Sequence, residues 1–316
     1  MRKSTYIILT LICTVIILLI QSLIGGPGLS STDSSLSLSK EEILKSPQGP
    51  LISAVALGYF LLLLLGLINL IIFSYKKLNN KSIVNFPKQV FNLGLSQIKI
   101  YRIFFLISFL VLIIHSLVFV VSSLNLKFNS LNLLLIFNAL IQLGVLIILV
   151  TNINYKKFGL KFSLEQLKFL LKIYTITIPL LLLAIALNIY LLKIFGIENS
   201  LSPAIEILFL TKNYKSLLVL SIQIVFLGPL VEELFFRGFL FSLIRKNKGF
   251  LLSASLTSLA FSLLHRAPGN LLPLFVISCS LCYVYERTKS ISAPIIFHAL
   301  HNLINLLLFF IIKNLI

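Results

Sequence analysis

Long apolar runs alternate with short polar segments along most of the chain. Several runs reach the ~20 residues that a helix needs to cross the hydrocarbon core of a bilayer. They are rich in Leu, Ile and Phe and lack the period-two alternation of a membrane β-barrel strand. The pattern therefore predicts an all-α fold, a polytopic transmembrane helical bundle.

The runs suggest about 8–9 spans, because two of the later runs are short for a bilayer. Between the first two runs, residues 25–50 are rich in Ser, Gly and Pro and are expected to form a polar loop. Segments 83–102 and 153–170 mix Lys with Phe, Leu and Ile and are predicted to lie at the lipid surface. The predicted spans are 6–24, 51–74, 103–123, 131–151, 171–193, 217–243, 251–265, 271–286 and 292–312.

Composition supports a membrane location. Hydrophobic residues make up 58% of the chain and charged residues 11%, against roughly 25% charged residues in soluble domains. The net charge of +18 could suit a nucleic acid, but the basic residues form short clusters between apolar runs rather than one basic face. We therefore expect membrane lipids as partners and no nucleic acid.

The basic residues also predict an orientation. If the N-terminus is cytoplasmic, eighteen Lys and Arg residues fall on the inner side and eight on the outer side. This bias follows the positive-inside rule. The chain is thus expected to be a multi-pass protein with a cytoplasmic N-terminus, in the plasma membrane of a bacterium.

Few ionisable groups lie within the predicted spans. Such groups cost several kcal/mol in hydrocarbon and normally face a bundle interior or a water-filled cavity. His115 stands alone in its span, and its expected role is packing. The others cluster in the last third of the chain and comprise Glu232, Glu233, Arg237, His265, His298 and His301.

Three helices bring these groups to a similar depth. Glu232 lies 13 residues before Arg245, and His265 lies 17 residues after Lys248. His298 lies 9 residues after Lys289. At 1.5 Å per residue these offsets correspond to roughly 20, 25 and 14 Å from the same membrane face, so the three side chains are expected to meet.

Helical spacing assigns partners. Glu233 and Arg237 are four residues apart and can pair, whereas Glu232 points about 100° away. His298 and Asn302 share one face, and so do His301 and Asn305 in an alternative register; spacing alone leaves both registers open. Gly228 and Pro229 precede the glutamates, and their kink predicts a widened pocket beside Glu232.

The motifs in this region resemble those of a known family. "EELFFR" (Glu232, Glu233, Arg237), "FSLLH" (Phe261, His265) and "HALHN" (His298, Asn302) are similar to the EExxxR, FxxxH and HxxxN motifs of the CPBP family, the CAAX-protease and bacteriocin-processing intramembrane proteases, also called Abi or Rce1-like. The resemblance divides the chain into an N-terminal transmembrane scaffold, 1–216, and a catalytic core, 217–316.

The resemblance implies hydrolysis of a peptide bond in a membrane protein or peptide substrate. Glu232 and His265 would activate water, His298 and Asn302 would stabilise the oxyanion, and Glu233 would brace Arg237. The Ala after His298 resembles the family's "HA" and favours that register.

A cofactor is left open at this point. The family is conventionally classed with metalloproteases, and a divalent metal such as zinc would take Glu232, His265 and His298 as ligands. No HExxH zinc motif is present, and a glutamate-centred mechanism without metal fits the same residues. Three other interpretations stay open: a non-enzymatic membrane partner or bacteriocin immunity protein, a proton-coupled transporter, and a polar network that only fixes helix packing.

Overall fold

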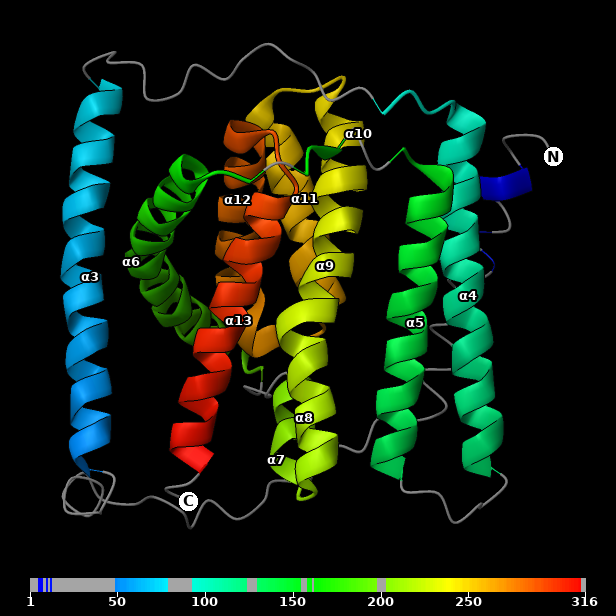
Figure 1. The fold of residues 1–316 in the computed structure, drawn as a ribbon, viewed down its shortest axis with the longest axis horizontal. Helices are drawn as coiled ribbons and strands as arrows, with labels where there is room; N and C mark the ends of the chain where they lie inside the picture. The colour runs from blue at the N-terminus through cyan, green and yellow to red at the C-terminus, as the bar shows by residue number, and fades with distance from the viewer. Residues whose placement is uncertain are drawn as a thin grey trace.

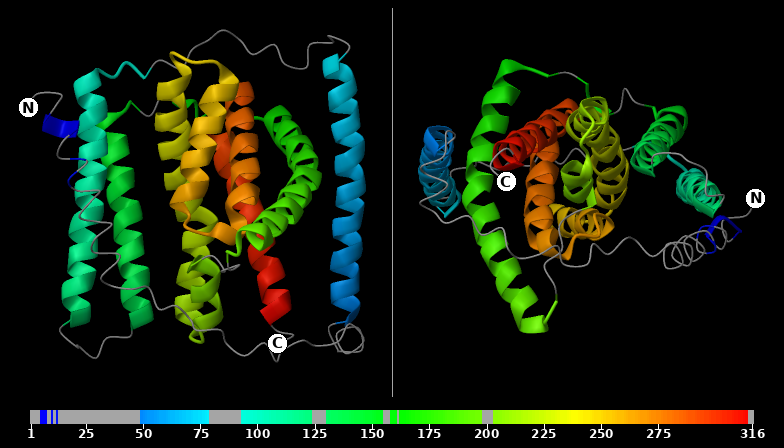
Figure 2. Two further views of the ribbon diagram at one scale, coloured as in Figure 1. Left: turned by 180° about the vertical axis from the view of Figure 1, so that it is seen from behind. Right: turned by 90° about the horizontal axis from the view of Figure 1, so that it is seen from below.

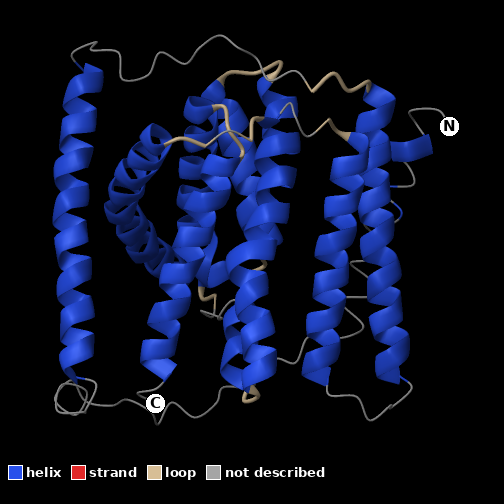
Figure 3. Cartoon of the chain, in the orientation of Figure 1, coloured by secondary structure: helices blue, strands red, loops and turns tan. Residues whose placement is uncertain are grey.

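The computed structural model describes residues 5–7, 10, 12, 49–78, 93–123, 130–154, 158–160, 162–197 and 203–313. Every regular element within these ranges is a helix (Figures 1 and 3). Most of the predicted span 6–24, the loop up to residue 48 and residues 83–92 lie outside the described residues. The all-α membrane bundle predicted from the sequence is confirmed for the rest.

Seven helices in the described part of the chain are long and apolar enough to cross a membrane. The first four are α3 (Gly49–Leu78), α4 (Gln97–Ser123), α5 (Ser130–Asn152) and α6 (Leu164–Phe195). The fifth runs from Tyr214 to Arg245, and the last two are α12 (Leu271–Thr288) with its preceding turn and α13 (Ser292–Lys313). A short helix, α7 (Pro203–Leu210), follows α6.

One predicted span is shorter than a bilayer requires. Segment 251–265 forms α11 (Phe250–Leu264), which has 15 residues, below the ~20 residues of a typical spanning helix. The chain turns at Arg266, which adopts a left-handed backbone with φ 51°, and a 3₁₀ turn (η4, Pro268–Asn270) leads into α12. His265 is thereby placed at the end of a helix, where it caps α11.

The fifth span contains two π-helical segments. α8 (Tyr214–Ile222) passes into a π-helical turn, η2 (Gln223–Leu227), then into α9 (Gly228–Glu233), a second π-helical segment, η3 (Leu234–Phe241), and α10 (Ser242–Arg245). Pro229 lies within this continuous helix and cannot donate a backbone hydrogen bond. Wider turns on either side of α9 let the helix pass the proline without breaking.

The helices form a row with a four-helix centre. Seen along the bundle (Figure 2, right), α9, α11, α12 and α13 lie together, α6 crosses one side of them with α3 outside it, and α5 and α4 flank the other side. The centre buries Phe239, Leu281 and Phe297, all with 0% exposure. Outer residues such as Leu57 and Ile71 stay exposed at 59% and 67%, as expected of surfaces that face lipid.

One membrane end is held by a segment that the sequence predicted to lie on the lipid surface. Within 153–170, Phe158 is buried at 1% exposure against Gly238, and residues 164–170 belong to α6. Ile291 donates its backbone N–H to the carbonyl oxygens of Phe158 and Gly159 at 3.0 and 2.8 Å. This clamp fixes the turn that joins α12 to α13.

An ion cluster ties the same end of the fifth span to α12. The buried carboxylate of Glu286 lies 3.2 Å from Arg245 and 3.2 Å from Lys289. Burial lowers the pKa of Lys289, although Glu286 partly offsets the effect. The cluster holds α10 against the end of α12. Because η3 and α9 belong to the same continuous helix as α10, the cluster also sets their depth along the bundle.

Candidate active site

Glu233 and Arg237 form a fully buried ion pair, as their spacing predicts. Arg237 Nη1 lies 2.7 Å from Glu233 Oε1, and both side chains have 0% exposure. Arg237 Nη2 donates to the hydroxyl and the carbonyl of Ser278 on α12, at 2.7 and 3.1 Å. Its guanidinium also lies over the ring of Phe261, 4.9 Å from the ring centre. The pair therefore joins the fifth span to α11 and α12.

The same carboxylate also binds a histidine of α13. His298 Nδ1 lies 2.8 Å from Glu233 Oε1, and the carboxylate that pairs with Arg237 can only accept hydrogen bonds. Nδ1 of His298 therefore carries the proton, and Nε2 of the neutral ring is an acceptor. His298 is almost fully buried, with a side-chain exposure of 7%.

His265 is fixed in the same way from α11. Its Nδ1 lies 2.7 Å from the carbonyl oxygen of Phe261, which can only accept, so Nδ1 carries the proton here too. The ring packs on Phe261 at 4.4 Å between ring centres. Nε2 is again left as the acceptor nitrogen.

The turn after His265 is held by a side chain that the sequence analysis did not identify. Asn188 of α6, with 3% exposure, donates to the carbonyl oxygens of Pro268 and Gly269 at 3.0 and 2.9 Å. Its own side-chain oxygen accepts the N–H of Leu272 at 3.1 Å. In the sequence, Asn188 is the one side-chain amide within the apolar run 171–193, and this isolated polar group could have pointed to a buried contact.

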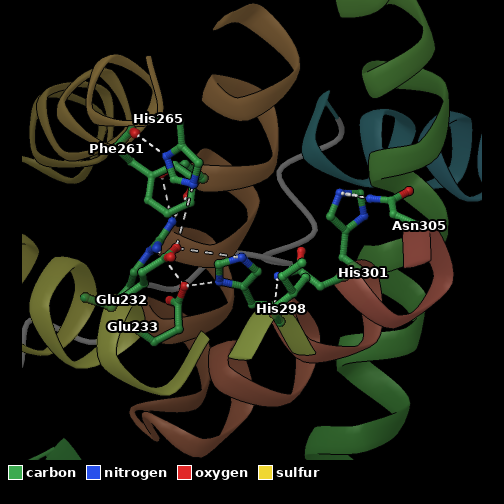
Figure 4. A network of polar contacts seen from close by, with 11 residues as sticks. Glu232, Glu233, Phe261, His265, His298, His301 and Asn305 are labelled. Carbon is green, nitrogen blue, oxygen red and sulfur yellow. Dashed lines mark hydrogen bonds and ion pairs between the residues drawn. The ribbon is translucent and has the colours of Figure 1, made fainter. Parts of the chain in front are cut away.

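Glu232 meets both acceptor nitrogens. Its Oε2 lies 3.8 Å from His265 Nε2 and 3.9 Å from His298 Nε2. These separations are too long for direct hydrogen bonds but suit contact through a shared water molecule. Figure 4 shows the three side chains pointing toward one another from three helices. The side chain of Glu232 as a whole is 32% exposed, unlike that of Glu233, but the oxygen that faces the two rings, Oε2, is buried and has no hydrogen-bond partner among the residues that the structure describes.

Asn302 contacts the π-helical turn η2, just before Pro229 in the fifth span. In η2 the N–H of Gly228 bonds to the carbonyl five residues earlier, that of Gln223. The next bond of this series would join residue 229 to Ile224, but Pro229 has no N–H. Asn302 Nδ2 instead donates to the Ile224 carbonyl at 2.8 Å. One amide hydrogen of Asn302 is therefore committed, and the other stays available.

The alternative pair lies apart from the glutamates. Asn305 Nδ2 is 3.0 Å from His301 Nε2, and His301 Nδ1 is 3.5 Å from the hydroxyl of Tyr174 on α6. Figure 4 shows His301 and Asn305 directed away from Glu232. His115 is also remote from this group and lies 2.8 Å from the carbonyl of Val111 in α4.

Glu232, His265 and His298 carry side chains of the types that bind metal ions in proteins. Among the residues that the structure describes, no group of three or more His, Cys, Asp or Glu side chains has a geometry that could hold a metal ion. The carboxylate and imidazole atoms that meet at Glu232 are 3.8 to 3.9 Å apart. As arranged in the structure, Glu232, His265 and His298 are not grouped as the ligands of a metal ion.

Comparison with known proteins finds similarity in the C-terminal region. Residues 214–304 match the model of the family described as Type II CAAX prenyl endopeptidase Rce1-like. A 75-residue segment is 29% identical to YdiL of Bacillus subtilis (strain 168), whose name describes it as a candidate membrane peptidase; the match covers 24% of this chain and 31% of that protein. No solved structure matches the chain significantly. The matched region runs from α8 into α13 and contains every side chain of the motifs.

Proposed function

We propose that this chain, in which residues 214–304 form an Rce1-like domain, is an intramembrane endopeptidase that cleaves a membrane-protein or peptide substrate. The observation that carries the proposal is the meeting of Glu232 Oε2 with the Nε2 atoms of His265 and His298. Both Nδ1 atoms are held by acceptors, so the two rings present acceptor nitrogens to a carboxylate oxygen, Glu232 Oε2, that has no hydrogen-bond partner of its own in the described part of the chain. Such a set can hold and deprotonate a water molecule.

In the proposed reaction Glu232 is the general base. A water molecule between Glu232 and His265 gives one proton to the carboxylate while its oxygen attacks the carbonyl carbon of the scissile peptide bond. The tetrahedral intermediate then expels the amine, which takes up the proton that Glu232 removed from the water. The direct products are a carboxylic acid and an amine, and the acid then gives its proton to the amine or to solvent.

The oxyanion needs donors, and the hydrogen bonds limit which groups can serve. Asn302 has one amide hydrogen left after its bond to Ile224. His298 becomes a donor only when Nε2 takes up a proton, because Nδ1 is held by Glu233. We assign the oxyanion to these two groups. The proton that Glu232 takes from the water passes to His298 Nε2 while the oxyanion exists, and it moves on to the departing amine when the intermediate collapses. Donors of this kind typically contribute 10²- to 10³-fold to the rate.

Purified protein in lipid nanodiscs provides the test. The probes are an internally quenched farnesylated peptide with a CAAX terminus and the membrane-peptide fraction of cells that express the protein, analysed by mass spectrometry. We expect Glu232→Gln and His265→Ala to lower cleavage by about 10² to 10⁴. The matched control is Glu165→Gln, which changes an exposed glutamate in the first turn of α6 and should cleave like the parent.

Equal cleavage by Glu232→Gln and the parent would refute the proposal. A non-enzymatic partner or immunity protein predicts instead that peptide binding or protection survives Glu232→Gln while no cleavage occurs in either protein. A proton-coupled transporter predicts uptake that depends on a proton gradient in the parent, again without cleavage.

A further inference from the structure

A cavity of about 240 Å³ lies on the side of α12 that faces α3 and α6. It is separate from the Glu232 site, because Ser278, which contacts Arg237, and Tyr283, which lines the cavity, point to different sides of α12. The cavity is lined by Ile72, Phe73 and Lys76 of α3, by Phe169, Lys172 and Ile173 of α6, and by Tyr283 and Arg287 of α12.

The charges around this cavity have one sign. Lys76, Lys172 and Arg287 come from three different helices, and no carboxylate is among the lining residues that the structure describes. The nearby Glu286 is engaged with Arg245 and Lys289, each at 3.2 Å. Three cations around one cavity repel one another unless an anion lies between them. The cavity is therefore complementary to a group with negative charge.

The cavity lies where a membrane changes from hydrocarbon to headgroups. Lys76 ends the apolar span Ser53–Lys76, and Arg287 is next to the last residue of the span Pro268–Thr288. The remaining lining is apolar or aromatic, and Ile72 beside it is 38% exposed toward the outside of the bundle. The two kinds of lining match the two parts of a phospholipid, a charged phosphate and an acyl chain.

Close contacts with α6 hold α3 beside the cavity. Below the cavity, α3 packs so closely on α6 that a Cβ on Gly66 would lie 2.9 Å from the ring of Pro179, and Asn69 Nδ2 donates to the Thr175 hydroxyl at 3.0 Å. Toward the membrane surface from these contacts, α3 and α6 both line the cavity. An occupant would fill the space between α3, α6 and α12 at the membrane surface.

We propose that this cavity is a binding site for an anionic glycerophospholipid. Its phosphate binds between the three cations, Lys76, Lys172 and Arg287. One acyl chain lies along Ile72, Phe73 and Phe169. The bound lipid joins α3 to the core at the end of the bundle that carries most of the positive charge. This proposal does not depend on peptidase activity.

Native mass spectrometry of detergent-purified protein tests the site. The probes are phosphatidylglycerol and phosphatidylcholine of the same acyl composition, and the thermal midpoint is measured with each lipid in parallel. We expect the parent to retain phosphatidylglycerol preferentially and to melt at a higher temperature with it. Removing each cation should weaken retention roughly fivefold, so the triple variant K76Q/K172Q/R287Q should lose the preference.

A charge-matched triple variant separates the cavity from general surface charge. Lys99, Arg102 and Lys168 are exposed and do not line the cavity, so K99Q/R102Q/K168Q should retain phosphatidylglycerol like the parent. If the first triple variant fails to fold, Lys76→Glu keeps the test open, because Lys76 is exposed at the end of α3.

Three outcomes would overturn the proposal. The first is equal loss of phosphatidylglycerol in both triple variants. The second is equal retention of the two lipids by the parent. The third is stabilisation by inorganic phosphate to the same extent as by phosphatidylglycerol, which would show a site for a free anion instead of a lipid.

Discussion

His298 and Glu233 are joined by a hydrogen bond of 2.8 Å between Nδ1 and Oε1, and this bond determines which ring nitrogen faces Glu232. Glu233 accepts from Arg237 with the same oxygen, at 2.7 Å. The second glutamate of the motif thus orients a histidine from α13 in addition to bracing Arg237. Arg237, Glu233 and His298 form one hydrogen-bonded chain, and its far end, His298 Nε2, lies 3.9 Å from Glu232 Oε2.

Loss of Arg237 is expected to destabilise the fold. Arg237→Met leaves the Glu233 carboxylate in a site of 0% exposure, and breaking a buried pair in this way typically costs about 3 to 5 kcal/mol. Adding Glu233→Gln removes the stranded charge and should restore part of the lost thermal stability. The measurement is the melting temperature in detergent, with the exposed Arg102→Met as control; purely additive losses in the double variant would contradict the pairing.

Asn302 is expected to have a structural role that can be separated from any catalytic one. Asn302→Leu removes the donor to the Ile224 carbonyl, and stranding that acceptor should cost about 1 to 3 kcal/mol. Pro229→Ala supplies a backbone N–H, so the loss of stability should be smaller in the Pro229→Ala background.

Peptide cleavage is then measured for the parent, Asn302→Leu, Pro229→Ala and the double variant. If Asn302 also binds the oxyanion, the activity lost in Asn302→Leu stays lost when Pro229→Ala restores stability. Full recovery of cleavage would assign Asn302 to structure alone.

The two HxxxN registers are expected to differ in activity. Asn305 bonds to His301, and His301 contacts the hydroxyl of Tyr174 on the side away from Glu232. His301→Ala and Asn305→Ala should therefore change kcat/KM by no more than about twofold. His298→Ala should lower it by about 10² or more. The reverse order, measured in nanodiscs with all three variants folded, would support the second register.

Gly228 is expected to be required beside Glu232. A Cβ at this position would lie 3.0 Å from the Gln223 carbonyl, 3.6 Å from Glu232 Oε1 and 3.8 Å from Gln142 Nε2. Only the contact with the Gln223 carbonyl is tighter than an ordinary van der Waals contact. Gly228→Ala should therefore shift the backbone of the π-helical turn before Glu232 and lower kcat by about tenfold or more, since small misplacements of reacting groups are costly.

A second glycine provides the control for this substitution. A Cβ on Gly58, in α3, meets nothing within 4 Å, so Gly58→Ala should leave cleavage unchanged and slightly favour the helix. If Gly228→Ala cleaves like Gly58→Ala, Glu232 is less constrained than the structure indicates.

The sequence by itself determined the membrane bundle and most of its spans. Apolar length is set by bilayer thickness, so runs such as 171–193 and 292–312 were predicted without knowledge of their neighbours. The pairing of Glu233 with Arg237 was also local, because four residues make one turn of a helix. Common depth along three helices then brought Glu232, His265 and His298 to one level.

The tertiary structure decided the contacts between helices. Rotation of α13 about its axis, which depends on packing against α6 and α9, turned His298 toward the glutamates and His301 toward Tyr174. Asn188 supports the turn after His265 through a hydrogen bond to a residue 80 positions away. Ser278 accepts a hydrogen bond from Arg237, which lies 41 positions earlier in the chain. Sequence periodicity shows which residues share a face of one helix, but it carries no information on which neighbouring helix that face meets.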